Sequence, residues 1–342
     1  MKQKILCIVQ ARKNSIRLPS KVLKKIKSKS ILEIILLRLK KSKKIDQIIL
    51  ATSNPKENHE LTSISKKLNI QTFFGSEKNV LDRYYNCAKK HKADIVVRVT
   101  GDCPIIDYKI IDKMLVRFLK EKNLNYFSNT IKRTFPDGLD VEIFTIKTLQ
   151  KTKKNATSNY DKEHVTSFMT RSKMFKIKNF SQKTNLSKER WTLDNYDDFI
   201  FIEKIFLNFK NIYFTQSDVI KYLNLNPKIK LINSKHEINE GGKMNLGQKY
   251  WNRALSIIPG GNMFFSKRPE LFLPNKWPTY FKKAKGYKIW DLDNNILSDF
   301  SFMGVGTNLL GYSNSEVDNF VTSKIKKGNI SPLNSFEDIQ LS

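Results

Sequence analysis

Residues 8–23 hold the side chains of this chain that are best suited to chemistry on an anion. A set of four hydrogen-bond donors, three of them cationic, stands within ten residues there: Arg12, Ser15, Arg17 and Lys21. They follow a short apolar run that ends at Val9, with Gln10 and Ala11 in between. Charged donors that converge on one point bind polyphosphates well. An open α/β sheet binds its ligands beyond the carboxyl ends of its strands. The pattern therefore predicts a phosphate-binding loop, and the alternative is a solvated basic turn.

A carboxylate follows a later apolar run in the sequence Gly101-Asp102-Cys103-Pro104. Mg²⁺ takes oxygen ligands and shares them with substrate phosphates, so Asp102 is a candidate metal ligand. The alternative is a Gly-Asp turn that ends a strand. Farther along the chain, Asp194 could cap a helix. Asp197 and Asp198 fall in the first turn of that helix, where carboxylates favour the helix dipole, and we expect no chemistry from them.

The elements that must position these groups alternate between strands and helices. Apolar runs predict strands at 5–9, 47–51, 72–75, 95–99 and 139–144, and helical periodicity predicts helices at 31–40, 58–68, 80–90, 160–170, 197–209 and 217–223. Alternating strands and helices imply a mostly parallel sheet with helices on both faces, which is an α/β fold. Farther on, a helix is expected over 246–258 and a strand pair over 280–291 and 296–300. We predict a domain at 1–227, a polar linker at 228–245 and a second segment at 246–342.

The spacing Arg12-x-x-Ser15-x-Arg17-Leu18-Pro19-x-Lys21 resembles the signature loop of sugar nucleotidyltransferases, in particular cytidylyltransferases of the spore-coat polysaccharide protein F and CMP-sugar synthetase type. One departure is Asn14, where the family usually has glycine, but asparagine tolerates left-handed backbone. The resemblance implies a Rossmann-like nucleotidyltransferase domain. It also implies that Asp102 and Asp194 bind Mg²⁺ and that the loop, including Gln10 and Ala11, binds the nucleotide.

Further residues are weaker candidates for the same site. Thr52 could line the base pocket, and Arg83 could support the nucleotide or be an ordinary helix residue. Segments that match the family supply candidates for binding the acceptor: Asn129, Asp137, Gly138, Glu163 and His164. A structural, hydrogen-bonded role for His164 is equally compatible with the sequence. Asp140 and Glu142 are expected to share one face of the strand at 139–144.

The part of the chain after residue 246 resembles the start of glutamate-1-semialdehyde aminomutases, which are PLP-dependent class-III aminotransferases. The resemblance lies in residues 250–261, 284–295 and 306–311, with Tyr312 where that family usually has histidine. Its length implies a partial PLP-transferase-like segment. The Schiff-base lysine and most of the phosphate site would lie beyond it, so we do not expect PLP to bind here.

The composition sets limits on the partners. A formal net charge of +30 would suit nucleic acid, but the lysines are scattered along the chain, and a polyanionic small substrate accounts for the charge equally well. The three cysteines, Cys7, Cys87 and Cys103, lack the spacing of metal ligands. The sequence shows no secretory pattern and no membrane span, so the expected location is the cytoplasm. The oligomeric state is open, with a homodimer among the alternatives.

These observations predict a Mg²⁺-dependent nucleotidyltransferase that joins a sugar or sugar acid to a nucleoside triphosphate, with CTP inferred from the resemblance, and releases pyrophosphate. Arg12, Arg17 and Lys21 are the predicted catalytic side chains. One alternative is an aminotransferase or aminomutase with an ancillary nucleotidyltransferase domain. Two others are a regulatory module that only binds nucleotide and a nucleic-acid-binding protein.

Overall fold

The computed structural model describes residues 2–13, 15, 17–236, 245–273, 277–301, 304, 306–328 and 339. The chain forms two compact units, Met1–Ile238 and Asn239–Ser342. The first part of the expected linker belongs to the first unit, because Pro227–Leu231 forms the 3₁₀ helix η2 and Asn233 is buried. Residues 237–244 lie outside the described residues. The division at 227 and 245 therefore stays a prediction.

A seven-stranded sheet in the order β5-β4-β1-β6-β8-β7-β9 forms the centre of the first unit. Its strands are β1 (Ile5–Gln10), β4 (Gln47–Thr52), β5 (Gln71–Phe74), β6 (Ile95–Thr100), β7 (Tyr126–Ser128), β8 (Glu142–Thr145) and β9 (Ile177–Asn179). Only β8 runs against its neighbours, and β1 pairs in parallel with both β4 and β6. The predicted α/β fold with a mostly parallel sheet is confirmed.

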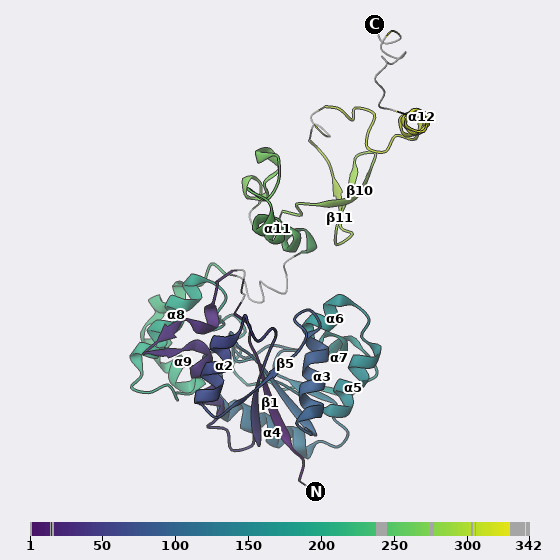
Figure 1. Cartoon of the computed structure of the whole chain (residues 1–342). Coiled ribbons are helices and arrows are strands. Elements are labelled where there is room, and N and C mark those ends of the chain that lie inside the picture. Colours follow the sequence, from purple (N-terminus) through teal and green to yellow (C-terminus); the bar gives the residue numbers. More distant parts are fainter. Residues whose placement is uncertain are drawn as a thin grey trace. The chain divides into compact units, whose positions relative to one another are not determined.

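Side chains of β1 alternate between two cores, as the two-residue period of a strand requires. Ile5, Cys7 and Val9 face one core, and Leu6 and Ile8 face the other. The first core is covered by α1 (Ile31–Leu39), α2 (His59–Lys67), α4 (Tyr108–Lys120), α8 (Tyr196–Asn208) and α9 (Gln216–Leu225). The second is covered by α3 (Val80–Lys90), α5 (Ile146–Asn155) and α7 (Ser167–Arg171), and α6 (Asn159–His164) packs against α3. Figure 1 shows α8 and α9 on one side of the sheet and α3, α5, α6 and α7 on the other. Between β1 and α1, the chain forms the helix η1 (Lys21–Leu23) and a hairpin of β2 (Lys25–Ile26) and β3 (Lys29–Ser30).

Some predicted elements differ from the structure. The helix expected over 160–170 is two helices, α6 and α7, because Val165 between them has φ of 59°. The strand expected over 139–144 begins only at Glu142. Asp140 therefore lies outside the strand and pairs with Arg133, so its shared face with Glu142 was predicted wrongly. The short strands β7 and β9 were not predicted, since three residues give no readable period.

The second unit begins with α11 (Leu246–Ile257), as predicted, and continues through η3 (Phe265–Lys267) and η4 (Pro269–Leu271). A three-stranded antiparallel sheet of β10 (Phe281–Lys285), β11 (Lys288–Asp291) and β12 (Ile296–Ser298) follows, and then α12 (Ser315–Ile325). The expected strand over 280–291 is thus a hairpin, which turns at Gly286 with a positive φ. Within the described part of the chain, no helix has the length and apolar character that a membrane crossing needs.

Candidate functional site

The loop that follows β1 and the loop that follows β6 lie against each other at the carboxyl ends of these two strands. The backbone N–H of Gly101 donates to the Gln10 carbonyl at 2.8 Å. A Cβ at position 101 would stand 2.9 Å from the Cβ of Ala11, so the close approach requires glycine there. Asp102, the next residue, is thereby fixed beside the loop that follows β1. The structure thus brings together the two segments that the sequence analysis placed in one site.

Lys21 connects three acceptors from different parts of the chain. Its ammonium lies 3.0 Å from Asp102 Oδ2 and 2.8 Å from Asp194 Oδ1, and it also donates to the Leu193 carbonyl at 2.8 Å. The Arg17 guanidinium lies 2.9 Å from the same Asp194 oxygen. Two carboxylates and two cations, separated by up to 177 positions in the sequence, therefore form one charged cluster.

The charges in this cluster shift one another's protonation equilibria. Burial by itself lowers the pKa of Lys21, but Asp102 and Asp194 outweigh burial, so the pKa is raised. For Asp102, burial raises the pKa, yet the Lys21 charge and a hydrogen bond from Thr100 outweigh it and lower the pKa to about 2. At neutral pH the lysine is therefore charged and Asp102 is ionised.

The segment that carries Asp194 is anchored by main-chain hydrogen bonds. Leu193 N–H donates to the Asp102 carbonyl at 2.8 Å, and Trp191 N–H donates to the Asp137 carbonyl at 2.6 Å. Residues 191–194 form no strand, and the preceding Arg190 makes an isolated bridge to Asp137. The N-cap of α8 is Asn195, so the interpretation of Asp194 as the cap was wrong.

The remaining candidates for nucleotide binding differ in their exposure. Arg12 has a side chain 51% exposed and lies 3.9 Å from Glu77, and Ser15 is half-buried. Thr52 is fully buried, with no hydrogen-bond partner for its hydroxyl among the described residues. The buried Arg83 donates to the Ser76 carbonyl at 3.0 Å, which holds the loop before α3. Burial lowers the pKa of Arg83. Asn14 lies outside the described residues.

The candidates for acceptor binding divide into two groups. Asn129 is buried, and its amide donates to the Leu139 carbonyl and accepts from Val141 N–H, so it holds the chain before β8. Gly138 has φ of 106° and packs against the backbone of Trp191, where a Cβ would lie 2.5 Å from the carbonyl carbon. The buried Asp137 thereby adjoins the segment that carries Asp194.

Glu163 and His164 lie at the end of α6, on the side of the sheet that α3 covers (Figure 1). Glu163 is exposed, and the His164 ring lies 4.3 Å from the Tyr160 ring. For all five candidates, Asn129, Asp137, Gly138, Glu163 and His164, contact with an acceptor stays a prediction.

Two buried ion pairs were not predicted from the sequence. Arg190 pairs with Asp198, and Arg98 pairs with Glu142. Glu142 also accepts hydrogen bonds from the hydroxyls of Tyr126 and Thr166, each at 2.6 Å. The available signal was an arginine inside an otherwise apolar strand, Ile-Val-Val-Arg-Val, since a buried charge needs a partner.

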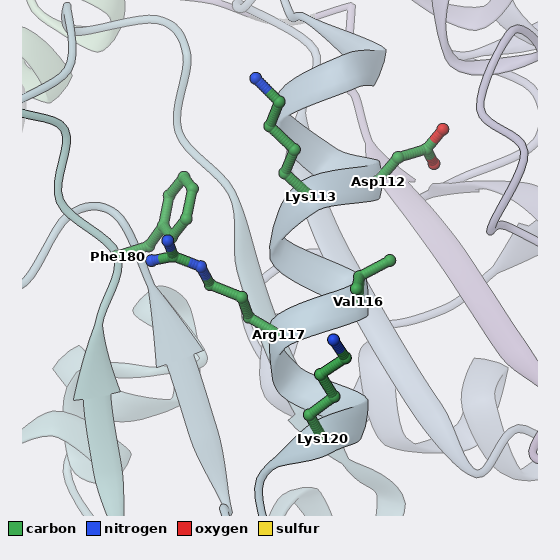
Figure 2. Close-up of a pocket in the computed structure, with 6 residues that line it drawn as sticks. All are labelled: Asp112, Lys113, Val116, Arg117, Lys120 and Phe180. Atoms are coloured by element: carbon green, nitrogen blue, oxygen red, sulfur yellow. The ribbon is translucent and has the colours of Figure 1, made fainter.

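A separate hollow lies on the outer side of α4. It has a volume of about 430 Å³ and is lined by Asp112, Lys113, Val116, Arg117, Lys120 and Phe180. Figure 2 shows Arg117 beside the Phe180 ring, and its guanidinium carbon is 5.0 Å from the ring centroid. None of the candidate site residues lines this hollow.

Comparison with known proteins agrees with this geometry. A family model described as cytidylyltransferase matches residues 6–223. The chain belongs to the cytidylyltransferase family. It is therefore a nucleotidyltransferase, and the first resemblance stated above is confirmed for this part of the chain.

Individual relatives match the same length of chain. An uncharacterized protein of Methanocaldococcus jannaschii is 41% identical over 234 residues, which cover 68% of this chain and 95% of that protein. A spore coat polysaccharide biosynthesis protein of Bacillus subtilis is 28% identical over 65% of this chain and 95% of its own length. The solved structure of a cytidylyltransferase from Leptospira borgpetersenii superposes with a TM-score of 0.65 and 33% identity, over 67% of this chain and 97% of that one.

The aminotransferase resemblance has weaker support. A glutamate-1-semialdehyde 2,1-aminomutase of Archaeoglobus fulgidus is 33% identical over 86 residues, a quarter of this chain. The chain spans only 19% of that relative. A likeness of this length shows neither the activity nor the cofactor.

Proposed function

We propose that this cytidylyltransferase uses Mg²⁺ and CTP to activate a sugar or sugar acid, releases pyrophosphate, and serves surface polysaccharide or glycoconjugate biosynthesis. The observation that carries the proposal is the convergence of Lys21, Arg17, Asp102 and Asp194 at the carboxyl end of the sheet. The similarity to the spore coat polysaccharide biosynthesis protein of Bacillus subtilis supports the biosynthetic role.

The donor set fits a divalent cation. One ammonium bonds an oxygen of each carboxylate at 2.8 and 3.0 Å, so Asp102 and Asp194 already direct oxygens at a single cation. No group of three or more acidic, histidine or cysteine side chains suited to a metal occurs in the described residues. Two carboxylates suit Mg²⁺, which usually takes its other ligands from water and substrate phosphates. When bound, Mg²⁺ would neutralise charge on the triphosphate oxygens.

The reaction then depends on positioning and charge. The acceptor oxygen forms a bond to the α-phosphorus of CTP while the bond to the pyrophosphate oxygen breaks, and no covalent enzyme intermediate is needed. Arg12, Arg17 and Lys21 stabilise the negative charge of the phosphates. Asp137, Gly138, Glu163 and His164 are proposed to contact the acceptor, with Thr52 and Arg83 on the nucleotide side.

Pyrophosphate release tests the proposal directly. We expect the wild-type protein to release pyrophosphate from CTP with at least one member of a panel of sugars and sugar acids. Asp102→Asn should lower this rate by about 100-fold or more, while the melting temperature stays close to that of the wild type. Glu121→Gln is the matched control, because it removes the same charge from an exposed ion pair with Lys178. Undiminished turnover by Asp102→Asn would refute the metal assignment, and nucleotide binding without turnover would favour a regulatory module.

A further inference from the structure

Asp197 and Asp198 are neighbours in the first turn of α8, but their side chains differ in burial and in partners. The side chain of Asp197 is 30% exposed and bonds Lys235 and His236 at the surface. The side chain of Asp198 has no exposed surface and pairs with Arg190, whose side chain is only 3% exposed. A helix-start carboxylate needs no buried partner, so the burial of Asp198 calls for another explanation.

Asp198 accepts five hydrogen bonds, three on Oδ2 and two on Oδ1. Oδ2 accepts from Arg190 Nη2 at 2.8 Å and from the backbone N–H groups of Asp194 and Asn195 at 3.0 and 2.9 Å. Oδ1 accepts from Arg190 Nε and from the Asn233 amide, each at 2.9 Å. These bonds outweigh burial, which alone would raise the pKa, and they lower the pKa of Asp198. The carboxylate is therefore ionised and rigidly held.

Two of these contacts act on Asp194. The hydrogen bond from Asp194 N–H fixes the backbone from which the Asp194 side chain projects toward Lys21. The Arg190 guanidinium also lies 3.6 Å from Asp194 Oδ2, so it could pair with either carboxylate. Arg190 makes its two short hydrogen bonds to Asp198, at 2.9 and 2.8 Å, and its contact with Asp194 is the longer one, so Asp198 holds the guanidinium in place beside Asp194.

We infer that Asp198 is the positioning residue of the cation site: with Arg190 and Asn233, it holds Asp194 at the orientation in which its carboxylate meets a divalent cation. The inference rests on the proposed function, because it needs Asp194 to be a metal ligand. Groups that orient a metal ligand commonly change metal affinity by about 10- to 100-fold when they are replaced.

Binding of Mn²⁺ in the presence of CTP, measured by the electron paramagnetic resonance signal of free Mn²⁺, tests the inference without turnover. We expect Asp198→Asn to weaken Mn²⁺ binding by about 10- to 100-fold. Raising the Mn²⁺ concentration should restore much of its rate of pyrophosphate release, which a merely structural defect would not allow. Asp197→Asn is the matched control, with the same chemical change one residue away, and should bind Mn²⁺ as the wild type does.

A folded Asp198→Asn protein that binds Mn²⁺ as tightly as the wild type would overturn the inference. If the single variant does not fold, the double variant Arg190→Gln/Asp198→Asn decides, because it leaves no unpaired buried charge. Weakened Mn²⁺ binding by the double variant supports the inference, and wild-type binding overturns it. Asp194→Asn distinguishes a failure of this inference from a failure of the proposed function. If this variant binds Mn²⁺ like the wild type, the proposed metal site itself is wrong.

Discussion

At the scale of single residues, Lys21 lies between the two candidate metal ligands. The ammonium was predicted to face the triphosphate, yet it bonds both candidate metal ligands and a carbonyl. A divalent cation on the same two carboxylate oxygens would be repelled by this charge at short range. If Asp102 and Asp194 bind Mg²⁺ as proposed, Lys21 and the metal would therefore compete for the two carboxylates, and phosphate oxygens would offer the lysine another partner.

This competition predicts an unusual variant. Lys21→Met should bind Mn²⁺ more tightly than the wild type when nucleotide is absent, by roughly tenfold if the repulsion is worth about 1.4 kcal/mol. Its pyrophosphate release should nevertheless fall, because a cation is lost from the phosphate site. Titration of Mn²⁺ into nucleotide-free protein measures the first effect, and the exposed Lys25→Met is the control. Equal or weaker Mn²⁺ binding by Lys21→Met would contradict the competition.

The sequence predicted the members of this cluster but not its connections. The basic loop and Asp102 are recognisable because each directly follows an apolar strand. That Lys21 reaches Asp194 depends on the packing of segments 173 positions apart, which no local pattern encodes. The same holds for Asp198, which reads as a helix-start residue until Arg190 and Asn233 are placed beside it.

At the scale of elements, the corner between α6 and α7 shows why local periodicity fails. A helix over 160–170 fits the sequence, but Val165 has φ of 59°, a region that a β-branched residue occupies only at a cost of roughly 1–3 kcal/mol. Contacts to two buried carboxylates enforce this backbone: Thr166 donates to Glu142, and Ser167 and Arg171 donate to Asp161. By contrast, β1, β4 and β6 were predicted well because long apolar runs leave few alternatives.

The anchor of this corner can be removed with little change in shape. Thr166→Val keeps the volume but loses the hydroxyl that donates to the buried Glu142 carboxylate at 2.6 Å. Hydrogen bonds to charged groups contribute about 1.5–3 kcal/mol, so the free energy of unfolding should fall by about that amount. Urea denaturation measures the loss, and Thr166→Ser, which keeps the hydroxyl, should lose less. Equal stability of the valine variant and the wild type would show that Tyr126 and Arg98 hold Glu142 without help.

At the scale of the whole molecule, the first unit has the attributes of an independent protein. It contains both cores of the central sheet and all the candidate site residues. The Methanocaldococcus relative aligns to 234 residues of this chain over 95% of its own length, so that protein consists of little besides this unit. Many large apolar side chains of the second unit are exposed, including Phe300, Leu309 and Met263. We therefore expect the first unit to fold and turn over substrate without the second.

A chain that ends at His236 tests this expectation. It retains Asn233, whose amide donates to Asp198 and to the Arg190 carbonyl, and it should unfold cooperatively and release pyrophosphate at the rate of the full chain. A chain that ends at Pro227, the boundary predicted from the sequence, lacks Asn233. It should be less stable by about 1–3 kcal/mol or more, since buried partners lose hydrogen bonds, and it should bind Mn²⁺ more weakly. A folded but inactive chain ending at His236 would instead mean that the second unit supplies part of the active site. That result would favour the alternative in which the nucleotidyltransferase unit is ancillary.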